Sequence, residues 1–326
     1  MSSEPQGLRV ALPGWARSAH WAQEPGLGVE ASAWPWLRAR AARRSTGAAA
    51  HWREWLLEGC PPAAALLAQW PAGPALRAAT NAAASEATWA VAEPVHLLTA
   101  IDHLRLAPPA ALALASADQE SLLAHLNAQL AGTPFALERS MVDSLWLLRC
   151  EEPIEVESTD PDVVVGRNIR DHLPRGRDAG TVRRLMTELQ MLLHEHPVNE
   201  RRARAGEPPV NSLWLWGFGK TGSAAATPLA QLATDDAWLA SLWRAHGGTT
   251  TSIDEAPALI AGRSTSALIA ITRAPTSDIE RRVLAPLRAA LGGARRGGFA
   301  LLAGEERVEL DARSRWRFWR RTRVPS

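Results

Sequence analysis

The sequence has no tyrosine, a single lysine (Lys220) and only two cysteines among its 326 residues. Cys60 and Cys150 lie far apart and lack the CxxC spacing of metal ligands, so neither a zinc site nor a disulfide framework is indicated. The sequence also lacks any run of 18 uninterrupted apolar residues, and its opening residues lack the basic start and apolar middle of a signal peptide. These absences predict a cytoplasmic protein that has no membrane partner.

Nearly all of the positive charge comes from arginine, because Lys220 is the only lysine among 36 basic residues. The 34 acidic residues leave a net charge of only +2, without the excess of positive charge that is typical of nucleic-acid-binding domains. The length and the 46% hydrophobic content suit one large globular domain or two ordinary ones. The composition therefore argues against a nucleic-acid partner.

Helical and strand patterns alternate along the chain, which favours an α/β fold with an at least partly parallel sheet. Strands are predicted at 8–14, 144–150, 211–219 and 267–271, and helices at 35–44, 116–130 and 178–195. The helix 178–195 has the clearest 3.6-residue period, and Pro197 is predicted to end it before a polar connection that reaches Pro209. The tail DARSRWRFWRRTR, from Asp311, predicts a half-buried strand whose aromatic residues close the sheet, although base stacking or a membrane surface would also suit it.

The stretch NSLWLWGFGKTG at 211–222 ends like a phosphate-binding loop. A P-loop has the pattern G-x-x-x-x-G-K-[ST], in which the first glycine lets successive backbone amides wrap the phosphates. If its last three residues fall on 219–221, the first glycine has to stand at Trp214. Pro228 also interrupts the helix that should follow the loop. We interpret the stretch as a buried strand and a glycine turn, not as a nucleotide site.

Longer tracts carry a family resemblance: GRNIRDHLPRGRDAG at 166–180, the run from Thr187 to Gly219, and WRFWRR at 316–321. They resemble the RpfE-type regulatory proteins, most densely from Trp89 to Gly219. That family is in turn similar to the archaeal-type cofactor-independent phosphoglycerate mutases, which share a tract like HPVN…R…G…PPVN…WG.G.

The resemblance implies an alkaline-phosphatase-like core interrupted by an inserted α+β subdomain. The core would comprise residues 1–87 and 207–326, and the insertion residues 88–206. It further implies two metal ions that are held by several Asp and His residues and that activate a nucleophile.

The expected metal ligands are missing from this sequence. The first acidic ligand should follow the first strand, but 13–15 read Pro-Gly-Trp and no aspartate precedes Asp102. Beyond Asn211 the only histidine is His246. The carboxylates that remain there include Asp235, Asp236, Asp254 and Asp278. We therefore predict a non-catalytic or regulatory protein with no catalytic residues, metal or cofactor, and the alternative is a phosphoglycerate-mutase-like, metal-dependent isomerase with displaced ligands.

The shared tract predicts a binding region for a small anion or a protein partner. It lies where a helix end meets a strand start, and such connections often carry function. Arginines and asparagines beside a glycine turn suit a small carboxylate or phosphate. The predicted ligand-binding residues are His194, His196, Asn199, Arg201, Arg202, Asn211, Trp216, Gly217 and Gly219.

The same residues also have a purely structural interpretation. The histidines would cap helix carbonyls, the asparagines would close turns, and Arg201 and Arg202 would form a solvated surface. The motif His194-Glu195-His196 also suggests a metal site, but metal-binding helices place histidines at i and i+4, on one face. The i, i+2 spacing therefore adds no metal to the prediction.

Overall fold

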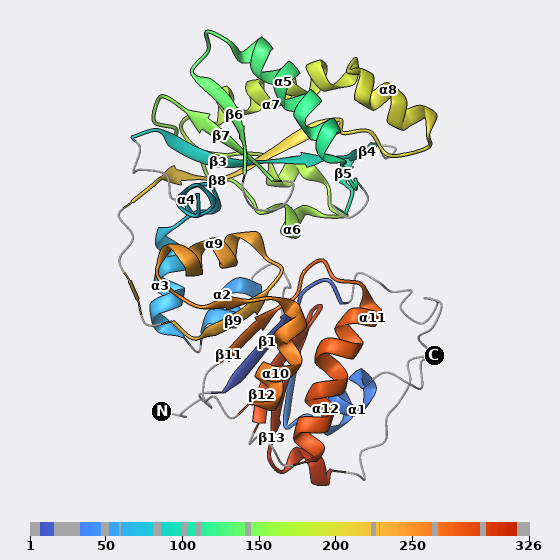
Figure 1. The fold of residues 1–326 in the computed structure, drawn as a ribbon. Helices are drawn as coiled ribbons and strands as arrows, with labels where there is room; N and C mark the ends of the chain where they lie inside the picture. Colours follow the sequence, from blue (N-terminus) through green and yellow to red (C-terminus); the bar gives the residue numbers. More distant parts are fainter. Residues whose placement is uncertain are drawn as a thin grey trace. The chain divides into compact units, whose positions relative to one another are not determined.

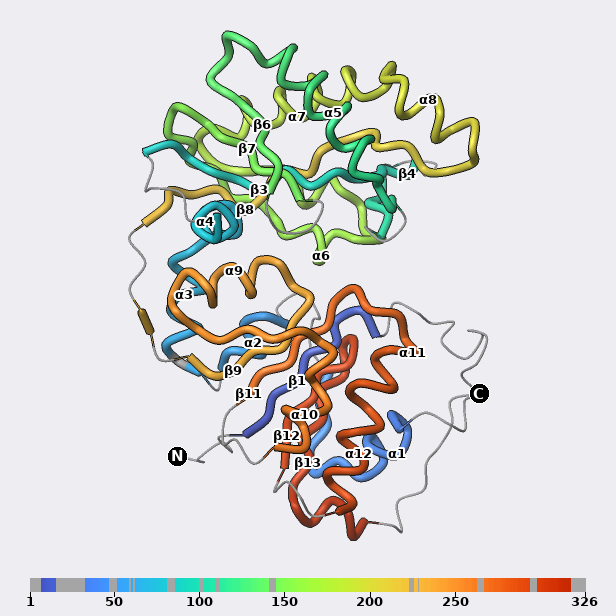
Figure 2. Tube along the Cα trace, viewed as in Figure 1, coloured from blue at the N-terminus to red at the C-terminus, as the bar shows by residue number. Residues whose placement is uncertain are grey.

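The computed structural model describes residues 7–15, 33–46, 52–58, 60–80, 86–99, 103–108, 112–140, 145–222, 226–227, 229–262, 267–293 and 298–317. The chain divides into unit 1, residues 1–66 and 226–326, and unit 2, residues 67–225. In Figure 2 the two ends of the colour scale run through unit 1 and the colours between them through unit 2. Unit 2 extends beyond the predicted insertion on both sides. It begins at residue 67, and at its other end it includes β8 (Ser212–Lys220), which pairs with β3 (Thr88–Val95). The assignment of a core and an insertion stays a prediction.

Unit 1 is built on a seven-stranded sheet in the order β10-β9-β11-β1-β12-β13-β2. The five strands from β10 to β12 are parallel, while β13 runs antiparallel to both β12 and β2. The strands are β1 (Leu8–Leu12), β2 (Arg43–Thr46), β9 (Gln231–Thr234), β10 (Thr250–Thr251), β11 (Ala267–Ala270), β12 (Gly298–Ala303) and β13 (Glu306–Asp311).

Helices cover both faces of this sheet, as its apolar central strands require (Figure 1). On one face Val10 of β1 shares a core with Leu287 of α12. On the other face the guanidinium of Arg9 lies 4.5 Å from the ring centroid of Trp55 in α2 and 3.0 Å from Glu58. The helical elements are α1 (Trp34–Arg40), α2 (Trp52–Leu57), α3 (Pro61–Gln69, ending in unit 2), α9 (Ala237–Ala245), η5 (Ile253–Glu255), α10 (Ala256–Ala261), α11 (Thr276–Ile279), η6 (Glu280–Leu284), α12 (Ala285–Gly292) and η7 (Ser314–Trp316).

Unit 2 contains an antiparallel four-stranded sheet in the order β6-β7-β3-β8 and a small β4-β5 hairpin. Figure 1 shows α5 and α7 on one side of the larger sheet and α4 on the other. The strands other than β3 and β8 are β4 (Leu97–Thr99), β5 (Leu104–Leu106), β6 (Phe135–Arg139) and β7 (Trp146–Cys150). The helices are α4 (Ala72–Ala78), α5 (Ser116–Leu130), α6 (Pro161–Val164), η4 (Ile169–His172), α7 (Ala179–His194) and α8 (Pro197–Arg204).

The α/β class predicted from the sequence is confirmed, and so is the strongly periodic helix, which is α7. Two local predictions are wrong. Residues 197–204 form α8 instead of a connection, because Pro197 occupies the first helical turn, where proline is favoured, and His196 caps the helix. The predicted helix 35–44 ends at Arg40, because the chain then forms β2, which pairs with β13.

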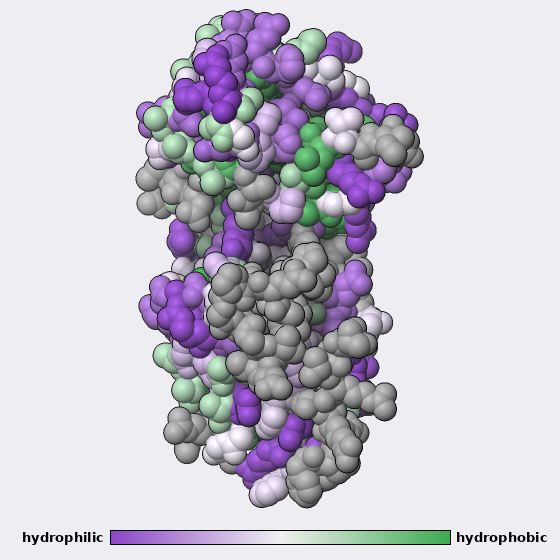
Figure 3. Space-filling view, turned by 90° about the vertical axis from the view of Figure 1, so that its right-hand side faces the viewer, coloured by the Kyte–Doolittle hydropathy of each residue, from purple (hydrophilic) through white to green (hydrophobic). Residues whose placement is uncertain are grey.

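The tail strand is also wrong over its described part. Residues 314–316 form the 3-10 turn η7, and Phe318 and the rest of WRFWRR lie outside the described residues. Leu98, Met191 and Trp316 are the large hydrophobic side chains exposed in the described ranges, and Trp316 is 61% exposed. On the side drawn in Figure 3, hydrophilic residues cover much of the described surface. Among the helices described, none is long and apolar enough to cross a membrane.

Both cysteines are buried thiols, and we expect them to react slowly in the folded chain. Burial raises the pKa of Cys150 to about 12, so the reactive thiolate is scarce at pH 8. Titration with an aromatic disulfide reagent should modify Cys150 at least roughly a hundredfold more slowly in the native chain than in denaturant. Rapid labelling of the Cys150 peptide in the native chain, detected by mass spectrometry, would contradict this burial.

Candidate functional site

The parallel strands of unit 1 end together at one edge of the sheet, which is the usual ligand position in open α/β folds. The residues that follow β1, β9 and β11 there are 13–15, 235–236 and 271–273, and we call them the carboxyl edge. Asp235 and Asp236 are the acidic residues in this set. Their hydrogen bonds therefore decide what the edge is able to bind.

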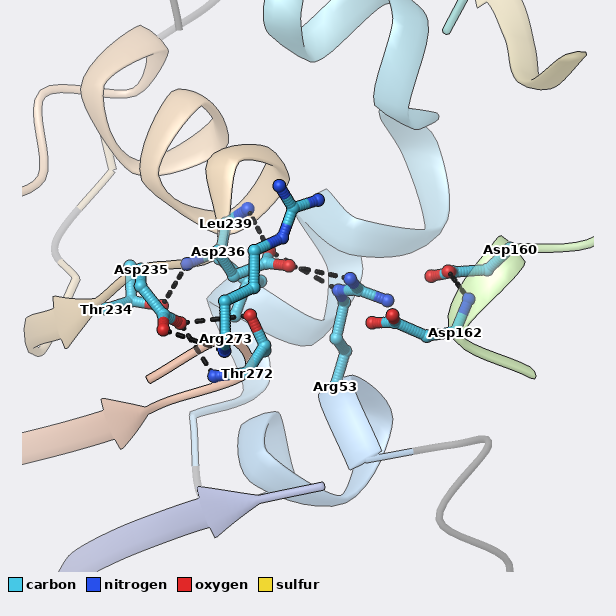
Figure 4. A network of polar contacts seen from close by, with 9 residues as sticks. All are labelled: Arg53, Asp160, Asp162, Thr234, Asp235, Asp236, Leu239, Thr272 and Arg273. Carbon is cyan, nitrogen blue, oxygen red and sulfur yellow. Dashed lines mark hydrogen bonds and ion pairs between the residues drawn. The ribbon is translucent and has the colours of Figure 1, made fainter. Parts of the chain in front are cut away.

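Asp235 ties the ends of β9 and β11 together (Figure 4). Its Oδ1 accepts hydrogen bonds from the Thr272 amide at 2.7 Å and the Thr272 hydroxyl at 3.0 Å, and its Oδ2 accepts one from the Arg273 amide at 2.9 Å. Burial raises the pKa of this carboxyl, while the three hydrogen bonds favour its charged form. Both carboxylate oxygens are thus engaged by neighbouring backbone and side-chain donors.

Asp236 is engaged by an arginine and by a helix N-terminus. Its Oδ2 lies 2.6 Å from Nη2 of Arg53, and its Oδ1 accepts a hydrogen bond from the Leu239 amide at 2.8 Å as the N-cap of α9 (Figure 4). The guanidinium of Arg53 also lies 4.4 Å from the ring centroid of Trp52 and 5.0 Å from that of Trp238. Because the side chains of Arg53 and Asp236 are only 9% and 8% exposed, this is a buried ion pair.

Asp254 and Asp278, the other two aspartates considered in the sequence analysis, contact arginines. Arg282 contacts both Asp254 and, at 3.6 Å, Asp278, and Asp278 also lies 2.7 Å from Arg281. Over the described ranges, no three His, Cys, Asp or Glu side chains gather into a group able to hold a metal ion. Among the residues that the structure describes, the donors therefore do not fit the two-metal site that the family resemblance implies.

The predicted binding residues lie in unit 2, where Asn199 joins the end of α7 to the start of β8. Its Nδ2 donates to the carbonyls of Leu193 and Val210, each at 2.7 Å, and its Oδ1 accepts from the Val210 amide at 2.8 Å. Asn199 is 4% exposed. All three bonds hold backbone groups in place, so the side chain serves the fold whatever else it does.

Arg202 and Asn211 also bond backbone groups of their own unit. Arg202 is buried, in contrast to the solvated position that the structural interpretation assumed, and its Nε donates to the Pro208 carbonyl at 2.9 Å. A second guanidinium nitrogen of Arg202 donates to the Leu112 carbonyl. Asn211 pairs with both backbone groups of Leu97, at 2.7 Å and 2.9 Å. These two side chains fix the approaches to β8 and β4.

Gly217 and Gly219 allow α4 and the residues before it to approach β8 closely. Gly217 has φ +66°, and a Cβ there would lie only 2.8 Å from the Cβ of Ala72. A Cβ at Gly219 would lie 3.1 Å from Cγ of Pro71. Trp216 is buried beside them. The glycine turn thus has a packing role at this contact.

Two members of the predicted set, His194 and Arg201, are exposed. Arg201 contacts Asp118 of α5, yet its own side chain is 60% exposed. His194 ends α7, whereas His196 is buried, so the two histidines of the HEH motif lie in different environments. Exposure therefore separates His194 and Arg201 from the buried members of the set.

His196 is held as a neutral ring. Its Nδ1 accepts the Val198 amide hydrogen bond at 3.2 Å, and its ring lies edge-on to His125 with centroids 5.0 Å apart. Burial lowers the pKa of His196, and repulsion from His125 and Arg201 lowers it further. A backbone hydrogen bond with Ser121 and the charge of Asp118 act in the opposite direction and raise this pKa. Protonation at Nδ1 would remove the cap of α8.

Acid should therefore destabilise this corner of unit 2. Because the pKa of His196 is lower in the folded chain than its unfolded value of about 6.5, the unfolded chain binds a proton that the folded chain does not as pH falls below that value. The free energy of unfolding should then fall by at most about 1.4 kcal/mol per pH unit. Urea denaturation at pH 7.5 and 5 should show a steeper loss for wild type than for His196→Asn, which caps without titrating. Equal losses would contradict the account.

Neither Arg53 nor His125 is predicted as a site residue from the sequence. Arg53 lies in an alanine-rich segment 183 residues before its partner Asp236, and no local pattern connects them. The position of Asp236 did carry a signal, because an aspartate just before a helical apolar run is a favoured N-cap.

No protein-family model matches the chain. Part of it is similar in sequence to phosphoglycerate mutases. The 2,3-bisphosphoglycerate-independent phosphoglycerate mutase of Methanothrix thermoacetophila is 48% identical over 65 residues, which are 20% of this chain and 17% of that protein. The protein of the same name from Methanosarcina barkeri is 29% identical over 123 residues, 37% of this chain and 31% of that protein. The chain thus matches less than a third of the length of either relative.

Among solved structures, a match to the cofactor-independent phosphoglycerate mutase from Thermoplasma acidophilum covers 93% of this chain and 89% of that one, at 14% identity and a TM-score of 0.39. A score this low supports no argument about the fold. The sequence similarity confirms the resemblance to archaeal-type cofactor-independent phosphoglycerate mutases over part of the chain. The RpfE-type assignment stays a prediction.

Proposed function

We propose that this chain is a cytoplasmic, non-catalytic regulatory protein of the RpfE type, built on an alkaline-phosphatase-like scaffold that derives from phosphoglycerate mutases. The observation that supports it best is the carboxyl edge of unit 1. Asp236 is neutralised there by the permanent charge of Arg53, and Asp235 accepts three hydrogen bonds from Thr272 and Arg273. Both acids are bound to groups of the fold, and a metal ion would have to share or displace these partners.

The proposed binding region is the predicted one in unit 2. Within it, the less exposed residues have a structural role and the exposed residues bind the ligand. The side chains of Asn199 and Arg202, which are buried, and of Asn211, which is partly buried, hold backbone groups in place. The exposed His194 and Arg201 contact a small anion or an acidic segment of a protein partner. Such a ligand would compete with Asp118 for the guanidinium of Arg201.

The partial sequence similarity to phosphoglycerate mutases favours one alternative, a metal-dependent isomerase with displaced ligands. The two functions differ in their need for a divalent ion. A ligand that prefers the folded state raises the thermal midpoint by mass action, so binding can be followed without knowing the reaction.

The test is a thermal-shift series with Mn²⁺, Mg²⁺ or Zn²⁺, each alone and with 3-phosphoglycerate, alongside a mutase assay. We expect no metal-dependent shift and no turnover. In the presence of a chelator, 3-phosphoglycerate should raise the thermal midpoint of wild type but not that of Arg201→Ala. The control is Arg204→Ala, which replaces an exposed arginine paired with Glu200 and should respond like wild type. A metal-dependent shift with turnover would establish the isomerase instead. If 3-phosphoglycerate causes no shift, the ligand of this region would be a protein partner and not this small anion.

A further inference from the structure

Two arginines of unit 1 share one tryptophan ring. Trp36 and Arg40 lie four residues apart on α1, so their side chains are neighbours on one face of the helix. The guanidinium carbon of Arg40 is 4.3 Å from the Trp36 ring centroid, and that of Arg288, from α12, is 5.5 Å from the same centroid. Two positive charges from separate elements thus contact one tryptophan ring.

This pair of charges is not balanced by an acid. Within the described ranges, neither Arg40 nor Arg288 forms an ion pair. Glu306 of β13, the strand against which α1 packs, is already bound by Arg38 at 2.6 Å and Arg44 at 2.9 Å. The two guanidiniums on Trp36 are therefore a local surplus of positive charge.

The arrangement is also unfavourable for Arg40 itself. Burial lowers the pKa of Arg40, and repulsion from Arg288 lowers it further. The Nε of Arg40 is buried and has no hydrogen-bond partner among the described residues, which is costly for a charged donor group. Arg288 is exposed, so solvent and solutes reach this side of the pair.

We propose that Arg40 and Arg288, held on Trp36, bind a small phosphate-type oxyanion. A dianion would offset both charges, and its oxygens would accept charge-assisted hydrogen bonds from both guanidiniums. The cation–π contacts already restrain the two side chains, so less conformational freedom is lost on binding. The proposal does not depend on the binding region of unit 2, because every residue in it belongs to unit 1.

The test is isothermal titration of the full chain with inorganic phosphate at constant ionic strength, with sodium chloride as the blank. We expect saturable binding to one site in wild type and a loss of affinity of at least about tenfold in Arg40→Gln and in Arg288→Gln. Arg313→Gln is the matched control, because Arg313 is an exposed arginine of the same unit that contacts no aromatic ring in the described structure. Its affinity should equal that of wild type.

Three results would overturn the proposal: no saturable binding in wild type, undiminished binding in Arg288→Gln, or an equal loss in Arg313→Gln. If Arg40→Gln fails to fold, Arg288→Gln decides alone, because Arg288 is on the exposed side of α12. As a second readout, phosphate should raise the thermal midpoint of wild type but not of Arg288→Gln.

Discussion

Replacement of Asp236 by alanine is expected to lower the free energy of unfolding by about 3–5 kcal/mol, because it removes the carboxylate from the buried ion pair with Arg53. The N-cap of α9 is lost as well, which adds about 1 kcal/mol. Urea denaturation followed by tryptophan fluorescence measures the change. The matched control is Asp254→Ala, which removes an ion pair in which Asp254 is 70% exposed and should cost no more than about 1 kcal/mol.

The double variant Arg53→Met/Asp236→Leu tests whether Arg53 and Asp236 stabilise the fold as a pair or independently of each other. When both charges are replaced by apolar side chains, the buried ion pair is removed as a whole, so the double variant should lose clearly less stability than the sum of its single changes. Additive losses would show that Arg53 and Asp236 do not interact. They would also remove the main support for the proposal that the acids of the carboxyl edge are engaged by the protein itself.

The second large effect is expected at Asn199. Asn199→Ala leaves the amide and carbonyl of Val210 and the carbonyl of Leu193 without their partner, and each buried unsatisfied group costs about 1–3 kcal/mol. The loss in unfolding free energy should therefore reach at least about 3 kcal/mol. Asn127 is a good control, because it bridges both backbone groups of Leu137, each at 2.8 Å, from a partly exposed position.

The comparison of Asn199→Ala and Asn127→Ala tests whether the predicted binding residue serves the fold first. We expect Asn127→Ala to cost clearly less, since water can replace part of its hydrogen bonding. If Asn199→Ala were as stable as wild type but bound 3-phosphoglycerate poorly, Asn199 would be a ligand contact and the division by exposure in unit 2 would be wrong.

Some of this architecture could be predicted from local sequence because the signal is local. The buried stripe of α7 follows the 3.6-residue period, and the apolar run of β11 belongs to a strand covered on both faces. The absence of an acid after β1 is also visible without a structure. That absence already argued against a two-metal centre.

The remaining features depend on contacts between residues far apart in sequence. The local pattern predicts Asn199 as a ligand contact. It does not show that Val210, eleven residues away, lies beside Asn199 and takes up its hydrogen bonds. The pairing of Arg53 with Asp236 spans 183 residues and needs the assembled sheet of unit 1. Pro197 predicts a helix end from the sequence alone, but a proline is equally favoured in the first turn of a following helix, which is where it lies in α8.

The central claim is that the carboxylates of the carboxyl edge are engaged by protein donors and hold no catalytic metal. The most direct test is a titration of the metal-free chain with Mn²⁺, in which free Mn²⁺ is measured by electron paramagnetic resonance, for wild type and Asp235→Ala. The account predicts no saturable binding by either protein. Stoichiometric Mn²⁺ binding by wild type that is lost in Asp235→Ala, with that variant still folded, would contradict it and place a metal at this edge.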